Sequence, residues 1–232
     1  MQDDPAPLAF DAPLLLVGGA PFARAAAAEA RALTGAVVAA DGGADRWAAQ
    51  GLGPPDAVIG DMDSLAEPEV WRGRLGDRFV HVREQDSTDL EKCLRLTRAP
   101  VTVGLGFMDG RLDHTLAALH ALMGRADRIL ALVGEEDAVA LLPPRWDMAT
   151  APGARISLFP LADVAPTGCA GLAWPVTGLR FRPGGKIGTS NRAAGDRVAV
   201  RSDAPGMIGL VERRFLPQLL DSLTAPDAGR WD

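Results

Sequence analysis

Two aspartates stand two positions apart in the segment Gly60–Ser64 (GDMDS), directly after the apolar run 57–59. In an extended backbone the side chains at positions i and i+2 point to the same side, so Asp61 and Asp63 can face one ligand together. Two carboxylates that share a site repel each other unless a positive charge lies between them. Mg²⁺ prefers oxygen ligands and is the usual cation where phosphates are bound. The alternative is a polar turn built from Asp and Ser.

Other carboxylates follow predicted strands in the same way. Asp41 comes after the apolar run 36–40, and Asp86 and Asp89 come after the run 79–82. In open parallel sheets the ligand binds beyond the carboxyl ends of the strands. Acidic side chains that recur at this edge favour a cation and phosphate site over isolated polar turns.

The elements that must position these residues alternate between short apolar runs and stretches of helical pattern. This alternation is typical of parallel βαβ units, and continuous apolar strands are typical of sheets covered on both faces. The predicted strands are 14–17, 36–40, 57–59, 79–82, 101–105 and 129–133, and the predicted helices are 21–33, 45–50, 67–74, 86–98 and 112–123. They predict an α/β domain over residues 14–140, with a mostly parallel sheet flanked by helices.

Helical periodicity largely disappears after about residue 140. Short apolar runs at 155–159, 171–174, 197–200 and 207–211 alternate with turns rich in Pro and Gly. This pattern predicts a smaller all-β domain over residues 141–222.

Composition and charge exclude several classes of protein. The formal net charge of −6 argues against non-specific nucleic-acid binding. No apolar run approaches the ~18 residues that a membrane-spanning helix needs, and the N-terminal segment lacks the basic region of a signal peptide. Cys93 and Cys169 match no metal-binding spacing, so we expect a reducing, cytoplasmic setting.

Asp41 is followed by Gly42 and Gly43 at the start of a predicted helix. Glycine lets backbone N–H groups approach a ligand, and a helix N-terminus favours phosphate. The alternative is an ordinary tight turn. The glycines form neither the dinucleotide-binding pattern G-x-G-x-x-G nor the P-loop pattern, which disfavours nicotinamide cofactors and P-loop chemistry.

The helix start after the predicted strand 79–82 carries a second group of polar residues. Thr88 and Glu91 have the spacing of a capping box. Asp86 and Asp89 lie three positions apart on one face, and Lys92 shares the face of Asp89. A carboxylate for a metal ion and an ammonium group for phosphate suit one site. The alternative is a surface ion pair between Asp89 and Lys92.

The loop after the predicted strand 101–105 contains Arg111, which can clamp a phosphate with two hydrogen bonds. Asp113 can hold Arg111 or His114 in place, or it can cap the helix that follows.

The all-β half offers fewer candidates. Trp174 beside Pro175 can form a flat wall for an aromatic ligand, or it can belong to the core. Ser190 and Asn191 offer directional polar contacts but also suit a turn.

In this order the segments resemble the thiamine pyrophosphokinase (thiamine diphosphokinase) family. The resemblance spans residues 14–212, and the ordered set is specific although each motif alone is weak. The motifs are AADGGA at 39–44, PD at 55–56, GDMDS at 60–64, DSTD at 86–89 with Lys92, GRLDH at 110–114, GLAWP at 171–175 and TSN at 189–191. Ala173 departs from the pattern, because Lys is common at this position in the family.

The resemblance implies an α/β catalytic domain followed by a β-sandwich domain that completes a thiamine pocket. It implies a homodimer with sites at the subunit interface, and transfer of the diphosphoryl group of Mg–ATP to the hydroxyl group of thiamine with release of AMP. The alternatives are a pyrophosphokinase that acts on another small alcohol, such as a hydroxymethylpterin, and a non-catalytic nucleotide-binding sensor.

The resemblance also implies a role for each matched residue. Mg²⁺ would be surrounded by Asp41, Asp61, Asp63 and Asp89, and the catalytic set would be Asp61, Asp63, Asp89 and Lys92. ATP and its phosphates would be bound by Asp41, Gly42, Gly43, Gln85, Asp86, Thr88, Arg111 and Asp113. Thiamine would be bound by Trp174, Ser190 and Asn191.

Overall fold

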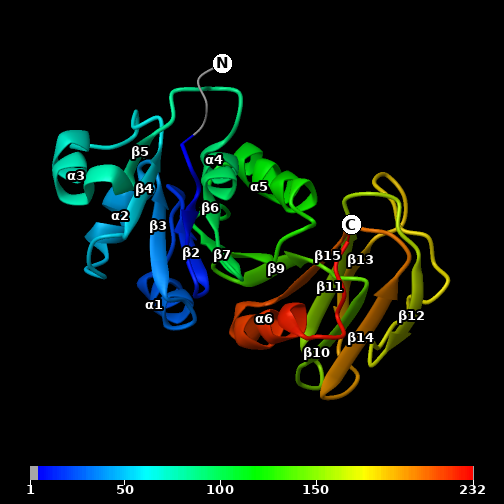
Figure 1. Cartoon of the computed structure of the whole chain (residues 1–232). Coiled ribbons are helices and arrows are strands. Elements are labelled where there is room, and N and C mark those ends of the chain that lie inside the picture. The colour runs from blue at the N-terminus through cyan, green and yellow to red at the C-terminus, as the bar shows by residue number, and fades with distance from the viewer. Residues whose placement is uncertain (1–4, 232) are drawn as a thin grey trace. The chain divides into compact units, whose positions relative to one another are not determined.

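The computed structural model describes residues 5–231, which form two compact units (Figure 1). The N-terminal unit is built from the chain up to residue 121 together with residues 132–135, and the C-terminal unit from residues 122–131 and from residue 136 onward. The domain limits 14–140 and 141–222 stay predictions.

The N-terminal unit alternates strands and helices. Its strands are β1 (Leu8–Ala9), β2 (Leu14–Val17), β3 (Ala36–Ala40), β4 (Ala57–Gly60), β5 (Phe79–His81), β6 (Thr97–Arg98) and β7 (Thr102–Leu105). Its helices are α1 (Arg24–Ala32), α2 (Gly43–Ala49), α3 (Pro68–Leu75) and α4 (Asp89–Leu96), with a 3₁₀ turn η1 at Gly76–Arg78. Two further elements, α5 (Leu112–Gly124) and β8 (Leu130–Val133), contribute residues to both units.

Five of these strands form a parallel sheet in the order β7-β2-β3-β4-β5. Every residue of β2, β4 and β7 is buried, as the continuous apolar runs predict. Figure 1 shows α1, α2 and α3 on one side of these strands and α4 on the other. Because β2, β3, β4 and β7 are parallel, the loops that follow them emerge at one edge of the sheet.

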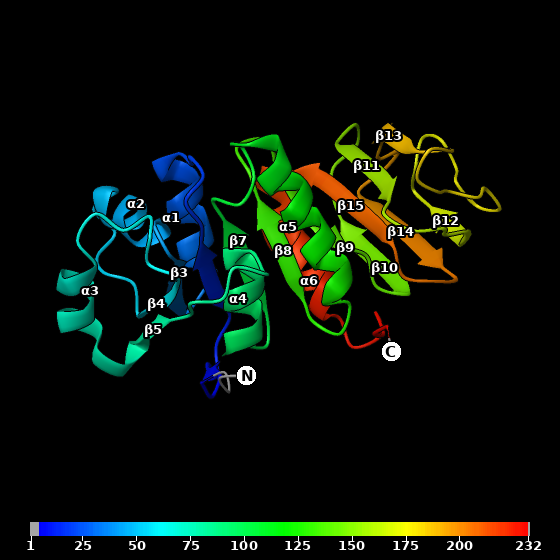
Figure 2. The ribbon, with the colours of Figure 1, turned by 90° about the horizontal axis from the view of Figure 1, so that it is seen from above.

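The C-terminal unit is mostly antiparallel (Figure 2). Its strands are β9 (Asp137–Leu141), β10 (Arg145–Ala149), β11 (Arg155–Pro160), β12 (Pro166–Ala170), β13 (Gly188–Arg192), β14 (Arg197–Ser202) and β15 (Met207–Glu212). They pair in two groups, β13-β11-β15-β9 and β10-β14-β12. The chain then forms a 3₁₀ turn η2 (Arg213–Phe215) and the helix α6 (Leu216–Thr224), which packs on β10 where Trp146 Nε1 donates to Ser222 Oγ at 2.9 Å.

The predicted fold class is confirmed, with local corrections in both units. The predicted helix 86–98 is shorter, because α4 begins at Asp89 and Thr97–Arg98 form the strand β6. The region predicted to be all-β also contains most of the helix α6. The run Gly171–Trp174 is not a strand, because β12 ends at Ala170 and Gly171 adopts φ of 72°. A Cβ on Gly171 would lie 1.9 Å from the carbonyl oxygen of Arg197, so only glycine fits this left-handed turn. The segment around Ser190 and Asn191 forms the strand β13 rather than a turn.

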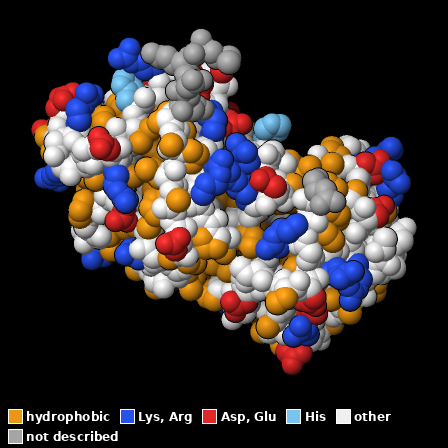
Figure 3. All heavy atoms as spheres, viewed as in Figure 1, with side chains coloured by type: hydrophobic (Ala, Val, Ile, Leu, Met, Phe, Trp, Pro, Cys, Tyr) orange, Lys and Arg blue, Asp and Glu red, His pale blue; other side chains and the backbone are white. Residues whose placement is uncertain are grey.

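Charged side chains of both signs are interspersed over the face of the molecule shown in Figure 3. Within residues 5–231, no helix combines the length and the apolar character that crossing a membrane requires.

Candidate functional site

A cavity of about 610 Å³ opens at the carboxyl ends of the parallel strands in the N-terminal unit. Its lining comes from the segments that follow β2, β3, β4 and β7 and from the start of α4. One part of the wall is acidic, and another part is apolar and includes Pro21, Phe107, Met108 and Ala117. A cavity of this size with one charged end suits a small charged ligand that also has an apolar part.

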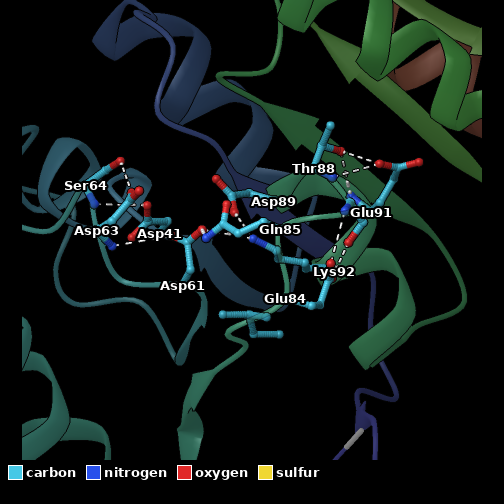
Figure 4. Close-up of polar contacts among 12 residues, drawn as sticks. Asp41, Asp61, Asp63, Ser64, Glu84, Gln85, Thr88, Asp89, Glu91 and Lys92 are labelled. Atoms are coloured by element: carbon cyan, nitrogen blue, oxygen red, sulfur yellow. Dashed lines mark hydrogen bonds and ion pairs between the residues drawn. The ribbon is translucent and has the colours of Figure 1, made fainter. Parts of the chain in front are cut away.

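Three carboxylates meet at the acidic end of this cavity (Figure 4). Asp41, Asp61 and Asp63 each place an oxygen atom so that these atoms all lie within 4.8 Å of one another. Asp41 follows β3, and the other two follow β4, so adjacent parallel strands bring them together. Asp61 and Asp63 thus lie on the same side of their loop, next to Asp41.

Asp41 is the most buried of the three, with 2% of its surface exposed. Its backbone adopts φ of 45°, and its Oδ2 accepts a hydrogen bond from Ser64 N at 3.2 Å. Its buried Oδ1 has no hydrogen-bond partner among the described residues. Burial, together with the charges of Asp89 and Asp61, raises the pKa of Asp41 to about 6. A buried carboxylate oxygen without a partner is costly unless a cation binds it.

Asp41→Asn is therefore expected to stabilise the protein at alkaline pH in buffer without divalent cations. Because the pKa of the folded protein (about 6) exceeds the ordinary value of 3.8, stability falls as the pH rises from about 4 to 6. Removing the charge should raise the free energy of unfolding by roughly 1–3 kcal/mol at pH 8 and by less near pH 5. Urea unfolding at both pH values measures this, with the exposed Asp77→Asn as control. An equal effect of Asp41→Asn at both pH values would contradict the assignment.

Close backbone approach in this region requires glycine at two positions. A Cβ on Gly43, at the start of α2, would lie 2.1 Å from the carbonyl oxygen of Val17. A Cβ on Gly60 would lie 2.8 Å from the Cβ of Asp41. The tight packing brings the ends of β2, β3 and β4 together. Gly42 lines the cavity, whereas Gly43 serves the packing behind it.

Lys92 joins the acidic group from α4 and is 2% exposed. Its Nζ lies 3.2 Å from Asp61 Oδ2 and 3.2 Å from Asp89 Oδ1. The ion pair between Asp89 and Lys92 is therefore present, but its ammonium group is buried and not on the surface. Burial lowers the pKa of Lys92, but the charges of Asp89 and Asp61 outweigh it and raise the pKa above its usual value. Burial also raises the pKa of Asp61, but hydrogen bonds from Gln85 and Lys92 reverse this effect.

The loop before α4 is organised by Glu84, which the sequence reasoning missed. Glu84 accepts hydrogen bonds from Asp86 N (2.8 Å), from Ser87 N (3.1 Å) and from the Ser87 hydroxyl, and its Oε1 lies 3.0 Å from Arg95. These contacts, the Ser87 hydroxyl first, lower the pKa of Glu84 to about 2. The turn aims Gln85 at the acidic group, where its Nε2 donates to Asp61 Oδ2 at 2.7 Å (Figure 4).

Thr88 caps α4, and the predicted capping box with Glu91 is confirmed. Asp89 lies one residue further, outside the group of three carboxylates, and its Oδ1 contacts Lys92 instead. Burial raises the pKa of Asp89. Asp86 is exposed and does not line the cavity; its backbone N–H contributes to the Glu84 turn.

Arg111 lines the cavity and lies in the loop after β7. Its guanidinium group binds Asp113 through Nε (3.1 Å) and a terminal nitrogen (2.5 Å), so Asp113 orients Arg111. Both side chains are largely exposed. His114 also lines the cavity.

The three residues predicted to bind thiamine lie in the C-terminal unit. Trp174 is 58% exposed, and the buried Asn191 fixes its backbone on both sides. Asn191 Oδ1 accepts from Trp174 N at 3.1 Å, and Asn191 Nδ2 donates to the Trp174 carbonyl oxygen at 2.7 Å. Ser190 has φ of 61°, and its N–H donates to Ser157 Oγ at 2.9 Å. The backbone that carries the exposed indole ring is thereby held in a defined place.

The residues at the acidic end suit a hard divalent cation. They supply three carboxylates, and one of their buried oxygens has no protein partner among the described residues. A neighbouring ammonium group limits the excess negative charge.

Comparison with known proteins points to one family. The family description "Thiamin pyrophosphokinase, catalytic domain" matches residues 31–132, and "Thiamin pyrophosphokinase, vitamin B1 binding domain" matches residues 147–207. Thiamine pyrophosphokinase 1 of Arabidopsis thaliana is 30% identical over 167 residues, which are 65% of this chain and 62% of that protein. Thiamine pyrophosphokinase 2 of Oryza sativa subsp. japonica is 30% identical over 171 residues, again 65% and 62%. The chain thus matches less than two thirds of the length of these curated relatives.

Solved structures share the fold. Thiamin pyrophosphokinase from Geobacillus thermodenitrificans superposes with a TM-score of 0.70 at 23% identity, covering 86% of this chain and 96% of that chain. The enzyme from Candida albicans gives a TM-score of 0.71 at 15% identity, covering 90% and 94%. The two family regions lie in the predicted order and together span more than half of the sequence, so the chain belongs to the thiamin pyrophosphokinase family.

Proposed function

We propose that this protein is a thiamine diphosphokinase, which transfers the diphosphoryl group of Mg–ATP to the hydroxyl group of thiamine and releases AMP. The observation that carries the proposal is the group of Asp41, Asp61 and Asp63 beside the buried Lys92, at the strand ends of a chain from this family. The relatives from Arabidopsis thaliana are named thiamine pyrophosphokinases, which supports the same reaction here.

The proposed roles follow from the contacts of each side chain. Asp41, Asp61 and Asp63 would hold Mg²⁺, which when bound withdraws negative charge from the phosphates. Lys92 supplies a fixed positive charge on the other side of Asp61. We assign the phosphates of ATP to the surrounding groups that line the cavity: Gly42, Gln85, Thr88 and Arg111. Asp113 orients Arg111. Gly43 allows the close packing of the backbone at the start of α2, and the backbone N–H of Asp86 donates to Glu84 and so shapes the turn before α4.

The reaction needs little covalent chemistry from the protein, because positioning and charge neutralisation do most of the catalysis in phosphoryl transfer. The thiamine hydroxyl oxygen attacks the β-phosphorus of ATP. The bond between the β-phosphorus and the oxygen that bridges to the α-phosphate breaks, and AMP leaves with that oxygen. We assign the hydroxyl proton to Asp89, because this carboxylate lies outside the group of three and burial raises its pKa.

We propose that the C-terminal unit recognises thiamine through the exposed ring of Trp174, with Ser190 and Asn191 nearby. Trp174→Ala should raise the KM for thiamine about tenfold, since aromatic and cation–π stacking are each worth roughly 1 kcal/mol. The KM for ATP should stay within about twofold, and Trp174→Phe should recover most of the loss. Steady-state kinetics with each substrate varied measure this. An unchanged KM for thiamine in Trp174→Ala would refute the stacking role.

Two properties implied by the family resemblance complete the proposal. We infer a homodimer with sites at the subunit interface, which light scattering of the purified chain can test. We also infer a cytoplasmic setting, consistent with the free thiols of Cys93 and Cys169.

The proposed function is tested by incubating the protein with ATP, thiamine and Mg²⁺ and separating the products by chromatography. Thiamine diphosphate and AMP should form in equal amounts and only when Mg²⁺ is present. A hydroxymethylpterin supplied with thiamine should not be converted. Preferred turnover of the pterin would favour the other pyrophosphokinase, and nucleotide binding without any turnover would favour a sensor.

A further inference from the structure

The loop of residues 61–66, which follows β4 and carries two of the three grouped carboxylates, is held at its far end by a carboxylate that does not line the cavity. Asp45 Oδ2 accepts a hydrogen bond from Ala66 N at 2.7 Å, where the loop ends. Asp45 Oδ1 accepts from the indole Nε1 of Trp71 at 2.7 Å. Trp71 belongs to α3 and is 4% exposed, so its N–H has a fixed place.

The loop alternates between the cavity and the core. Asp61, Asp63 and Ser64 line the cavity. Met62 and Leu65, each 8% exposed, point the other way and pack in the core cluster that also contains Trp71. Met62 adopts φ of 68°, a conformation that side chains other than glycine keep only where the surroundings enforce it.

One rigid element connects both parts of the acidic group. Asp45 lies in the first turn of α2, which begins two residues after Asp41. Ala44 N donates to the Asp41 carbonyl oxygen at 3.0 Å, so Asp41 and Asp45 belong to the same helix start. A hydrogen bond from Ala66 to Asp45 therefore fixes the loop relative to Asp41.

We propose that Asp45 and Trp71 are positioning residues that hold Asp61 and Asp63 at the distance from Asp41 that a divalent cation requires. Neither residue touches the cation or a substrate. Supporting contacts around metal ligands commonly change metal affinity by about 10–100-fold when removed. The inference rests on the proposed function only for the identity of the reaction, because cation binding can be measured without turnover.

Two conservative substitutions remove these hydrogen bonds. Trp71→Phe keeps an aromatic ring in the core and deletes the donor to Asp45. Asp45→Asn keeps the shape of the side chain but turns an NH₂ group toward one of the two N–H donors. Trp47→Phe is the matched control, because Trp47 is a buried tryptophan of α2 whose Nε1 has no hydrogen-bond partner among the described residues.

The probe is Mn²⁺ without nucleotide or thiamine. The full chain is titrated with Mn²⁺, and electron paramagnetic resonance measures the concentration of free Mn²⁺ at each step. Trp71→Phe and Asp45→Asn should each weaken Mn²⁺ binding about tenfold. The two residues act through one contact, so the double variant should bind Mn²⁺ within about twofold of the single variant with the lower affinity. Trp47→Phe should stay within about twofold of the unchanged protein.

The proposal is overturned if Trp71→Phe and Asp45→Asn lower the melting temperature as Trp47→Phe does but leave Mn²⁺ affinity unchanged. It is also overturned if the unchanged protein does not bind Mn²⁺. If Mn²⁺ binding responds as expected while no thiamine diphosphate forms in the product assay, the proposed function fails and the positioning role stands.

Discussion

Asp61→Asn is expected to lower the rate of AMP formation by about 10³-fold while the chain stays folded. The carboxylate is one of the three grouped side chains, and its Oδ2 contacts both Gln85 (2.7 Å) and Lys92 (3.2 Å). The amide would lose the negative charge that a cation needs, and it would leave Lys92 paired with Asp89 alone. The side chain is 12% exposed and lines the cavity, and Lys92 keeps Asp89 as a partner in the variant.

Asp63→Asn should have a similar effect on turnover, because its oxygen completes the same group. Asp77→Asn is the matched control, since Asp77 is exposed in the same unit and does not line the cavity. Circular dichroism and the melting temperature report whether each variant is folded. Near-normal turnover in folded Asp61→Asn or Asp63→Asn would remove the cation site from the account.

Lys92→Met is expected to reduce both activity and stability. The ammonium group is 2% exposed and offsets the charges of Asp61 and Asp89, so its removal leaves buried negative charge without compensation. We expect the free energy of unfolding at pH 8 to fall by about 2–4 kcal/mol. This is less than for a fully buried ion pair, because Asp89 is 41% exposed and solvent screens its charge. Turnover should fall by at least about 10²-fold, since a fixed positive charge near the phosphates is lost.

The pH dependence of this effect follows from the direction of the pKa shift. The pKa of Lys92 is raised above its ordinary value of 10.5. The contribution of Lys92 to stability is therefore complete at neutral pH, and it is lost only as the pH rises above 10.5 and through the raised pKa. Protonation of the carboxylates at low pH should shrink the destabilisation by Lys92→Met.

Lys186→Met is the matched control for Lys92→Met, because Lys186 is the other lysine of the chain and is exposed. Urea unfolding at pH 5 and pH 8 together with the product assay measures the effects. If Lys92→Met were as stable and active as Lys186→Met, the buried ammonium group would have no role in the site.

The sequence was sufficient to predict the α/β part of the fold because its strands are continuous apolar runs separated by helical patterns. Local spacing also located Asp61 and Asp63 and the capping box of Thr88 and Glu91, since these depend on neighbours in the chain. The C-terminal unit was less predictable. Its strand β12 ends at Ala170, just before the left-handed Gly171, and α6 supplies apolar surface that no strand pattern indicates.

The contacts that complete the site join residues far apart in the sequence. Lys92 binds Asp61 across 31 positions, and Asp45 binds Trp71 across 26. Nothing in local spacing distinguishes Asp45 or Glu84 from the other surface acids. Two weaker signals could have directed attention to them. Asp45 follows the Asp-Gly-Gly segment, and Glu84 lies shortly before the polar segment 86–89.

In the proposed reaction a diphosphoryl group, and not a single phosphoryl group, is transferred from ATP. Incubation with thiamine, Mg²⁺ and ATP labelled at the γ-phosphate tests this directly. The label should appear in thiamine diphosphate, with one unlabelled AMP for each product molecule. Formation of ADP with labelled thiamine monophosphate, or no transfer to thiamine by the folded protein, would contradict it.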